Sequence, residues 1–128
     1  MFDMPALVGS VHHVSFRVDN LEEALSFYQD VLGCRRIPRP DAISVPGAWL
    51  QAGDTQVHII ETPADDSTGT PPTRINPVAC HVAFRTSNLD GAEAALRERG
   101  FRVERGPSEV AQIFVRDPSG NLIELSPY

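Results

Sequence analysis

The sequence predicts an α+β fold in which two βαβββ modules follow one another along a chain of 128 residues. The first observation is an internal repeat, in which a segment that starts at His13 (HVSFRVDNL) returns 68 positions later, starting at His81 (HVAFRTSNL). The second observation is that the later parts of the two halves, residues 49–63 and 113–127, align without a gap. Self-similarity on this scale indicates a structural unit that is present twice.

The first half begins with a predicted strand at residues 11–18, which alternates and is rich in β-branched and aromatic side chains. Asn20 then caps a helix over residues 21–32, and Glu23 completes a capping box three positions later. Gly33 stands where a left-handed helix stop is needed. Three short strands are expected to follow, at residues 34–37, 48–51 and 56–61.

The second half repeats this order of signals. A strand is predicted at residues 79–86, Asn88 caps a helix over residues 89–99, and Gly100 ends that helix. Three strands again follow, at residues 101–104, 111–115 and 122–126. Each half is therefore expected to form a four-stranded sheet with one helix on one face.

The halves are separated by residues 62–77, which are rich in Pro, Gly, Thr and Asp. This composition indicates a linker. A module of about 60 residues alone buries little surface. We therefore expect one domain over residues 1–128, made of modules at about 9–62 and 77–128. Because a sheet with one helix leaves its other face open, the modules are expected to pair and to enclose a curved cavity.

Composition excludes several classes of function. A net charge of −6 and a pI near 5.1 disfavour nucleic acid as a partner. No apolar run approaches the ~20 residues of a membrane span, and the first residues lack a secretion signal, so we expect a cytoplasmic protein without a membrane partner. Two cysteines do not make a disulfide framework, and we interpret Cys34 and Cys80 as small core residues.

Polar residues gather on one face of the predicted strands. Side chains alternate along a strand, so His13 in the first module and His81 in the second point to the face that the helices do not cover. Glu124, on the last strand, has the same parity. Two imidazoles and one carboxylate on a shared cavity are a ligand set for a divalent Fe, Mn, Zn, Ni or Co ion with open coordination positions.

At these residues the chain resembles the vicinal oxygen chelate superfamily, which includes glyoxalase I, methylmalonyl-coenzyme A epimerase, extradiol dioxygenases, fosfomycin resistance enzymes and bleomycin-binding proteins. The resemblance covers residues 11–127. It is carried by four segments: HVSFRV at residues 13–18, FYQDVLG at 27–33, HVAF at 81–84 and FVRDPSGNLIEL at 114–125. The set is specific for the fold and much less specific for a particular reaction.

The resemblance implies that His13, His81 and Glu124 are metal ligands. Members with four ligands, such as glyoxalase I, also use a side chain on the last strand of the first module. The gapless alignment places Ile60 opposite Glu124, which counts against glyoxalase I. His58 lies two residues earlier on the same face, and is either a fourth ligand, if the register differs, or a proton-transfer residue above the metal.

Other residues on the same face are candidates for substrate binding. Arg17 and Arg85 offer planar guanidinium groups that can clamp a carboxylate or phosphate, or they pair with nearby acidic residues. Ser15 shares the face of His13 and Arg17. Trp49 is a candidate wall of the ligand pocket, whereas Phe114 is expected to fill the core.

The resulting hypothesis is a metal-dependent lyase, isomerase or dioxygenase whose small oxygenated substrate binds the ion through two neighbouring oxygens. Glu124 and His58 are the candidates to move a proton. The alternative is a metal-free protein that sequesters a drug or metabolite, as bleomycin-binding members do. The resemblance also implies a homodimer, with the site formed either within one chain or between His13 of one chain and His81 of the other.

Overall fold

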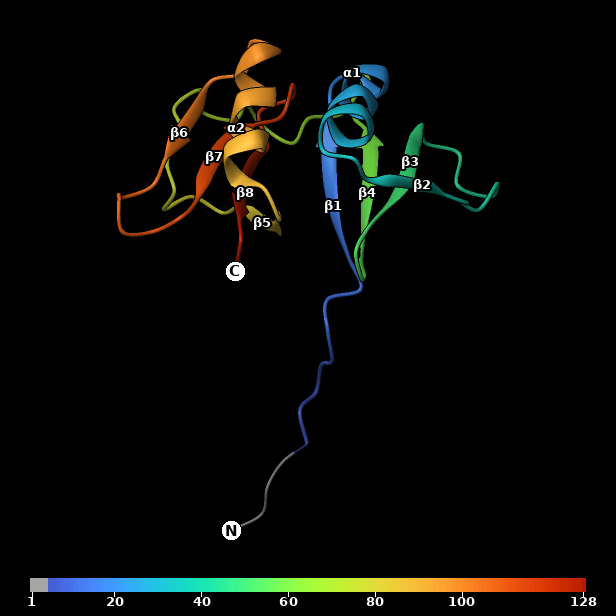
Figure 1. Ribbon diagram of the computed structural model, residues 1–128. Helices are drawn as coiled ribbons and strands as arrows, with labels where there is room; N and C mark the ends of the chain where they lie inside the picture. Colours follow the sequence, from blue (N-terminus) through green and yellow to red (C-terminus); the bar gives the residue numbers. More distant parts are fainter. Residues whose placement is uncertain (1–4) are drawn as a thin grey trace.

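The computed structural model describes residues 5–128 and contains two separate four-stranded sheets, each accompanied by one helix (Figure 1). The strand order is β1-β4-β3-β2 in the first sheet and β5-β8-β7-β6 in the second. Each sheet contains one parallel pair, β1 with β4 and β5 with β8, and its other pairs are antiparallel. The predicted tandem of βαβββ units is confirmed.

The first half contains an extended arm that leads into β1, a helical segment and three further strands. The helical segment starts as an α-helix and continues as a wider π-helix up to Val31. The elements are β1 (His13–Val18), α1 (Leu21–Leu25), η1 (Ser26–Val31), β2 (Arg35–Ile37), β3 (Gly47–Ala52) and β4 (Thr55–Glu61).

The second half repeats this order with a regular helix. Its elements are β5 (Val82–Arg85), α2 (Leu89–Glu98), β6 (Val103–Arg105), β7 (Ile113–Arg116) and β8 (Leu122–Ser126). No helix among residues 5–128 is long and apolar enough to cross a membrane.

The predicted helix boundaries are confirmed by hydrogen bonds and backbone angles. The Asn20 side chain accepts a hydrogen bond from the backbone N–H of Glu23, and the Asn88 side chain accepts one from that of Gly91. The helices end before Gly33 and Gly100, whose φ angles of 81° and 87° lie in the left-handed region that glycine tolerates.

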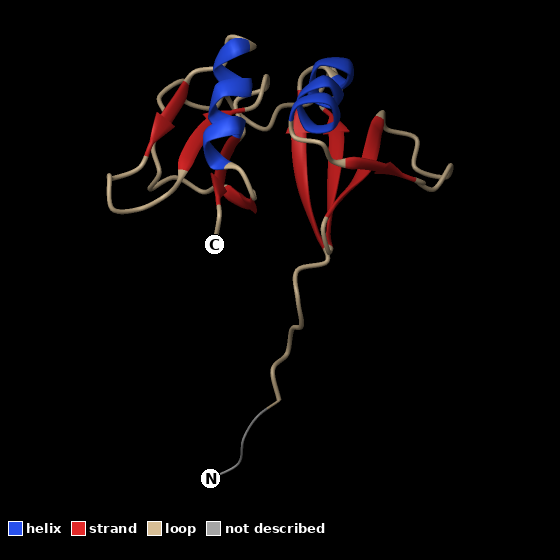
Figure 2. Cartoon of the chain, viewed as in Figure 1, coloured by secondary structure: helices blue, strands red, loops and turns tan. Residues whose placement is uncertain are grey.

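The alternation of β1 is also confirmed. Phe16 and Val18 are buried beneath the helix, while His13 and Ser15 on the opposite face are exposed. We call this opposite face of each sheet, the one that the helix does not cover, the open face. The covered faces of both sheets contribute to one hydrophobic core cluster. The two helical segments lie at the same end of the molecule (Figure 2), and Phe27 contacts Phe101 there with ring centroids 5.2 Å apart.

A buried hydrogen bond also joins the halves. The hydroxyl of Tyr28 donates to Oδ2 of Asp117 across 2.6 Å, and both residues are almost fully buried. The turn that begins at Asp117 reaches the end of β1 as well, because Ser119 accepts a hydrogen bond from Arg17, and Asn121 donates one to the backbone carbonyl of Arg17.

Two expectations need correction. Cys34 is buried as predicted, but Cys80 is exposed, because β5 begins only at Val82 and the residues before it form a loop. The linker is also less polar in its contacts than expected, since Ile75 is buried against Phe114 and Leu122. These contacts cover part of the open face of the second sheet.

Candidate functional site

The pairing of strands shows which positions are equivalent in the two sheets. On the open face of the first sheet, His58 lies opposite Ser15 and Trp49. On the second sheet, Glu124 lies opposite Ala83 and Phe114 in the same way. His58 is therefore the structural counterpart of Glu124.

The alignment that placed Ile60 opposite Glu124 is wrong by two residues. Ile60 pairs with Arg17 at the end of β1 and is 37% exposed, whereas His58 is 7% exposed. Ile60 therefore does not count against a four-ligand site. The sheet adopts the alternative register, in which His58 is the counterpart of Glu124.

In the second sheet, His81 and Glu124 lie together. Nε2 of His81 is 3.1 Å from Oε1 of Glu124, although the two residues are far apart in the sequence. Nδ1 of His81 lies 2.8 Å from the backbone carbonyl of Ala79, which can only accept a hydrogen bond. Nδ1 therefore carries the proton, and the carbonyl fixes the orientation of the ring.

This orientation has a chemical consequence. With its proton on Nδ1, a neutral His81 presents a lone pair at Nε2 towards a carboxylate oxygen of Glu124. Two acceptors at this distance need a positive centre between them, either a proton on Nε2 or a bound cation. Metal-ligating histidines commonly donate their other ring N–H to a carbonyl in this manner. The pair therefore fits half of a divalent metal site.

The surroundings of this pair are apolar on one side. The ring of Phe114 meets His81 edge-on, with centroids 5.6 Å apart, and Phe114 is buried as expected. Arg116 hydrogen-bonds the carbonyl of Arg74 across 3.1 Å, which holds the linker beside the sheet near Ile75. The linker therefore forms a fixed wall next to the open face.

The open face of the first sheet carries a stack of three rings. The His58 imidazole lies between Trp49 and His13, with centroid distances of 4.1 Å and 4.0 Å and nearly parallel planes. Nε2 of His58 is 2.9 Å from Oε1 of Gln56, so a proton on Nε2 leaves Nδ1 as the unprotonated nitrogen. His13 contacts its neighbour His12 through their Nδ1 atoms at 2.9 Å.

The electrostatic surroundings favour a neutral His58. Burial is the main cause that lowers the pKa of His58, and the nearby His13, His12 and Arg39 lower it further because they disfavour a second positive charge. A neutral imidazole has the lone pair that metal binding and proton abstraction both require.

Within one chain, the candidate ligands of the first sheet lie apart from those of the second sheet. His81 and Glu124 meet each other, and His13 meets His58. No group of three His, Cys, Asp or Glu side chains within residues 5–128 is placed to hold a metal ion. The predicted arrangement of His13, His81 and Glu124 around one ion is not formed inside this chain.

The candidates for substrate binding are placed differently from one another. Ser15 and Trp49 lie beside His58 on the open face. Arg17 forms an ion pair with Asp19 at 2.8 Å and a hydrogen bond with the carbonyl of Ser119. Of the two alternatives for Arg17, a substrate clamp or a pair with an acidic residue, the structure contains the second. Arg85 donates from Nε to the carbonyl of Tyr128 at 2.6 Å and lines a cavity between the two halves of the chain.

Comparisons with known proteins agree with this fold and these motifs. The model of the Glyoxalase/Bleomycin resistance protein/Dioxygenase superfamily matches residues 10–125. The chain belongs to this superfamily. It is 33% identical to Glyoxylase I 4 of Arabidopsis thaliana, over 94% of this chain and 72% of that protein.

A second relative and a solved structure are also similar to this chain. The chain is 28% identical to metallothiol transferase FosB of Shouchella clausii, over 93% of this chain and 80% of that protein. The crystal structure of a putative glyoxalase family protein from Bacillus anthracis superposes with a TM-score of 0.76 at 27% identity, covering 95% of this chain and 97% of that one. The recognition of the family and the fold from the sequence is confirmed.

Sequence reasoning missed the residues that orient the imidazoles. The carbonyl of Ala79 is a backbone group, and no side-chain pattern reveals it. Gln56 lies two residues before His58 on the same strand face, and its side-chain oxygen contacts the ring of His58. Alternation along β4 was the available signal for Gln56.

Proposed function

We propose that this protein is a divalent-metal-dependent enzyme of the superfamily that acts on a small oxygenated substrate. The observation that carries the proposal is the orientation of His81, whose Nε2 faces Glu124 while Nδ1 is held by a carbonyl. A carbonyl that holds the other ring nitrogen is a common feature of metal-ligating histidines, and it therefore supports the proposal.

The remaining ligands come from the first module. His13 occupies the position equivalent to His81, and His58 occupies the position equivalent to Glu124. Since the two pairs are separate within one chain, we infer that His81 and Glu124 of one subunit meet His13 and His58 of the partner subunit in a homodimer. His58 is then the fourth ligand, as the register of the sheet favours.

A divalent ion held there would supply Lewis-acid stabilisation of the negative charge that develops on two neighbouring substrate oxygens. The chain's own residues have distinct tasks. Glu124, whose side chain is 14% exposed, is the candidate to accept or return a proton when it is not engaged with a cation. Trp49 holds His58 in place by stacking, and Phe114 with the linker wall excludes water from the side of His81.

The first experiment measures metal content. Purified protein is loaded with Mn, Fe, Co, Ni or Zn, dialysed, and analysed by elemental mass spectrometry. We expect one ion per site in the wild type and at least a tenfold loss of affinity in His81→Ala and Glu124→Ala, as for the removal of ligands or their supports. Glu98→Ala, at an exposed carboxylate in α2, is the matched control for Glu124→Ala, and it is expected to retain the ion. If no metal binds under any loading condition, the enzyme proposal fails, and the metal-free sequestering function is favoured.

The second experiment tests whether the site is shared. His13→Ala and Glu124→Ala chains are each unable to complete a site. A mixed dimer contains one site made from the intact His13 of one chain and the intact Glu124 of the other. We therefore expect mixing after reversible unfolding to restore up to one site per mixed dimer. Sites formed within single chains would give no restoration.

The third experiment addresses the substrate. The metal-loaded protein is incubated with methylglyoxal and glutathione, catechols, an acyl-coenzyme A epimer and fosfomycin with a thiol. His58→Ala separates the two roles proposed for His58. Loss of metal supports a fourth ligand, whereas retention of metal with loss of turnover assigns proton transfer.

A further inference from the structure

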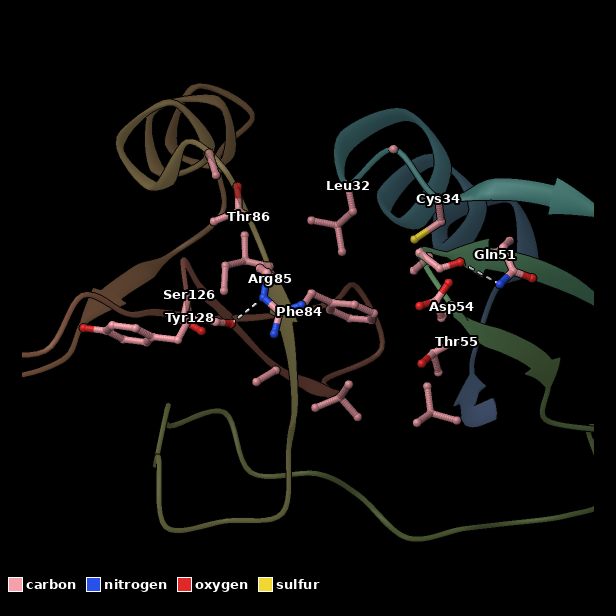
Figure 3. Close-up of a pocket in the computed structure, with 18 of the residues that line it drawn as sticks. Leu32, Cys34, Gln51, Asp54, Thr55, Phe84, Arg85, Thr86, Ser126 and Tyr128 are labelled. Carbon is pink, nitrogen blue, oxygen red and sulfur yellow. Dashed lines mark hydrogen bonds between the residues drawn. The ribbon is translucent and has the colours of Figure 1, made fainter. Parts of the chain in front are cut away.

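A cavity of about 920 Å³ lies between the two halves of the chain (Figure 3). Its first wall combines the end of the helical segment, at Leu32 and Cys34, with the β3–β4 hairpin at residues 51–55. Its second wall is the free edge of β5, including Phe84 and Arg85. Its lining, drawn from residues 5–128, includes none of the four side chains assigned to the metal site, so this is a different part of the molecule.

The lining of the cavity combines apolar and polar side chains. Val14, Leu32, Cys34 and Phe84 present hydrocarbon or sulfur to its interior, and all four are buried or half-buried. Asp54 and Arg85 are exposed and lie on opposite walls of the cavity (Figure 3). A cavity of this size that combines apolar walls with polar groups is typical of small-molecule sites.

Arg85 is held in a defined position. Its Nε donates to the carbonyl of Tyr128 at 2.6 Å, which leaves the two terminal nitrogens as donors towards a ligand. A guanidinium presents these donors as a planar fork that matches a carboxylate or sulfonate. Asp54 on the facing wall disfavours a second negative charge at the other end of the ligand.

We propose that this cavity binds a small amphipathic organic acid with a single negative charge, whose acid group meets Arg85 and whose flat apolar body packs against Phe84 and Leu32. The net charge of the whole chain is −6, so the attraction for an anion is local to Arg85. The proposal does not depend on the metal site, and metal-free protein is suitable for its test.

The test uses two dyes and one internal reporter. Anilinonaphthalene sulfonate is an anionic amphipathic dye, and Nile red is a neutral one. Cys34 reports on the cavity because it lines the wall, and the exposed Cys80 is first replaced in a Cys80→Ser background. Burial raises the pKa of Cys34 to about 11, so its alkylation by iodoacetamide is followed at pH 9 to 10.

We expect anilinonaphthalene sulfonate to bind and to slow the alkylation of Cys34 at least about threefold. Arg85→Gln is expected to weaken this dye by about fivefold, in line with loss of a charge-assisted hydrogen bond at an exposed position, and to leave the binding of Nile red unchanged. Arg85→Lys retains the charge and should retain most of the affinity. Arg36→Gln, at an exposed arginine of β2, is the matched control.

Three results would overturn the proposal. The first is equal binding of the anionic dye by wild type and Arg85→Gln, which would place the dye elsewhere. The second is binding without protection of Cys34. The third is that iodoacetamide does not alkylate Cys34, with or without dye, at any pH at which the protein stays folded. A second copy of the chain would then fill the cavity.

Discussion

Replacement of Tyr28 by Phe tests how strongly one buried hydrogen bond holds the two halves together. The Tyr28 hydroxyl and the Asp117 carboxylate are 2.6 Å apart, and neither has appreciable contact with solvent. The substitution removes one oxygen and leaves the ring contacts with Phe16 and Phe27 in place. Any loss of stability therefore reports on the hydrogen bond and not on packing.

The magnitude follows from the partners that Asp117 keeps. Hydrogen bonds to charged groups contribute about 1.5–3 kcal/mol. In the variant, Asp117 still accepts from the backbone N–H groups of Ser119 and Asn121 and from the Asn121 side chain. The charge of Asp117 therefore keeps three hydrogen-bond donors, and the loss of stability lies at the lower end of the 1.5–3 kcal/mol range. We expect a loss of about 1.5–2 kcal/mol, or roughly 5 °C in Tm.

The assay is urea unfolding followed by tryptophan fluorescence and circular dichroism, with the slope m compared between variants. Tyr128→Phe is the matched control, because Tyr128 is exposed and its hydroxyl only accepts from the N–H of Ala111 at 3.2 Å. A change of less than about 0.5 kcal/mol is expected there. If Tyr28→Phe is equally mild, the hydrogen bond does not stabilise the pairing of the halves, and the reasoning is refuted.

The same residue makes a prediction about pH. Burial, followed by the charge and hydrogen bond of Asp117, raises the pKa of Tyr28 well above its usual value near 10. Because the pKa of Tyr28 is higher in the folded state than in the unfolded state, its protonated hydroxyl contributes fully to stability below the unfolded-state pKa, near 10. This contribution declines as the pH rises towards the folded-state pKa. The difference in unfolding free energy between wild type and Tyr28→Phe is therefore expected to narrow above about pH 10, and a difference that stays constant to pH 11.5 would contradict this.

Three further predictions concern the backbone and the thiols. Gly47→Ala is expected to lower the free energy of unfolding in urea by about 2 kcal/mol or more, because a Cβ there clashes with the carbonyl oxygen of Ile59. Gly9→Ala, with no neighbour within 4 Å, is expected to leave it unchanged. Asn20→Ala should cost about 1 kcal/mol by the same measurement through loss of the helix cap, and an unchanged midpoint would show that the cap is dispensable. Cys34, whose pKa burial raises to about 11, should react with iodoacetamide at pH 8 at least about tenfold more slowly than exposed Cys80 by peptide mass spectrometry, and equal rates would contradict its burial.

The parts of the fold that the sequence predicts are those set by local chemistry. Asn20 and Asn88 accept hydrogen bonds from the N–H three residues ahead, and Gly33 and Gly100 adopt positive φ, because each depends only on neighbours in the chain. Cys80 could not be placed in this way. Its burial depended on where β5 begins, and strand ends are decided by the partner strand and not by the residue itself.

The register of β4 could not be predicted from the sequence, for a different reason. The β3–β4 turn has two residues between Ala52 and Thr55, whereas the β7–β8 turn has five between Arg116 and Leu122. The ladders make Trp49 the counterpart of Phe114 and His58 the counterpart of Glu124, and these two correspondences differ by one residue, so no gapless alignment matches both strands. A slip of two residues keeps every side chain on the same face of the strand, so alternation does not reveal the error. The exchange of Ile60 for His58 was therefore invisible without the hydrogen-bonded ladder.

The register also explains why the candidate site is divided. Strand parity places His13 and His58 on one open face, and His81 and Glu124 on the other. The covered faces are tied together by a common core and by the bond from Tyr28 to Asp117. Bringing the four proposed ligands together inside one chain would break the buried contacts in this core, which hold the halves together. A second chain can approach the open faces without disturbing the core. The proposed metal binding is therefore coupled to dimerisation, and changes that weaken the dimer should lower metal affinity even when all four ligands are intact.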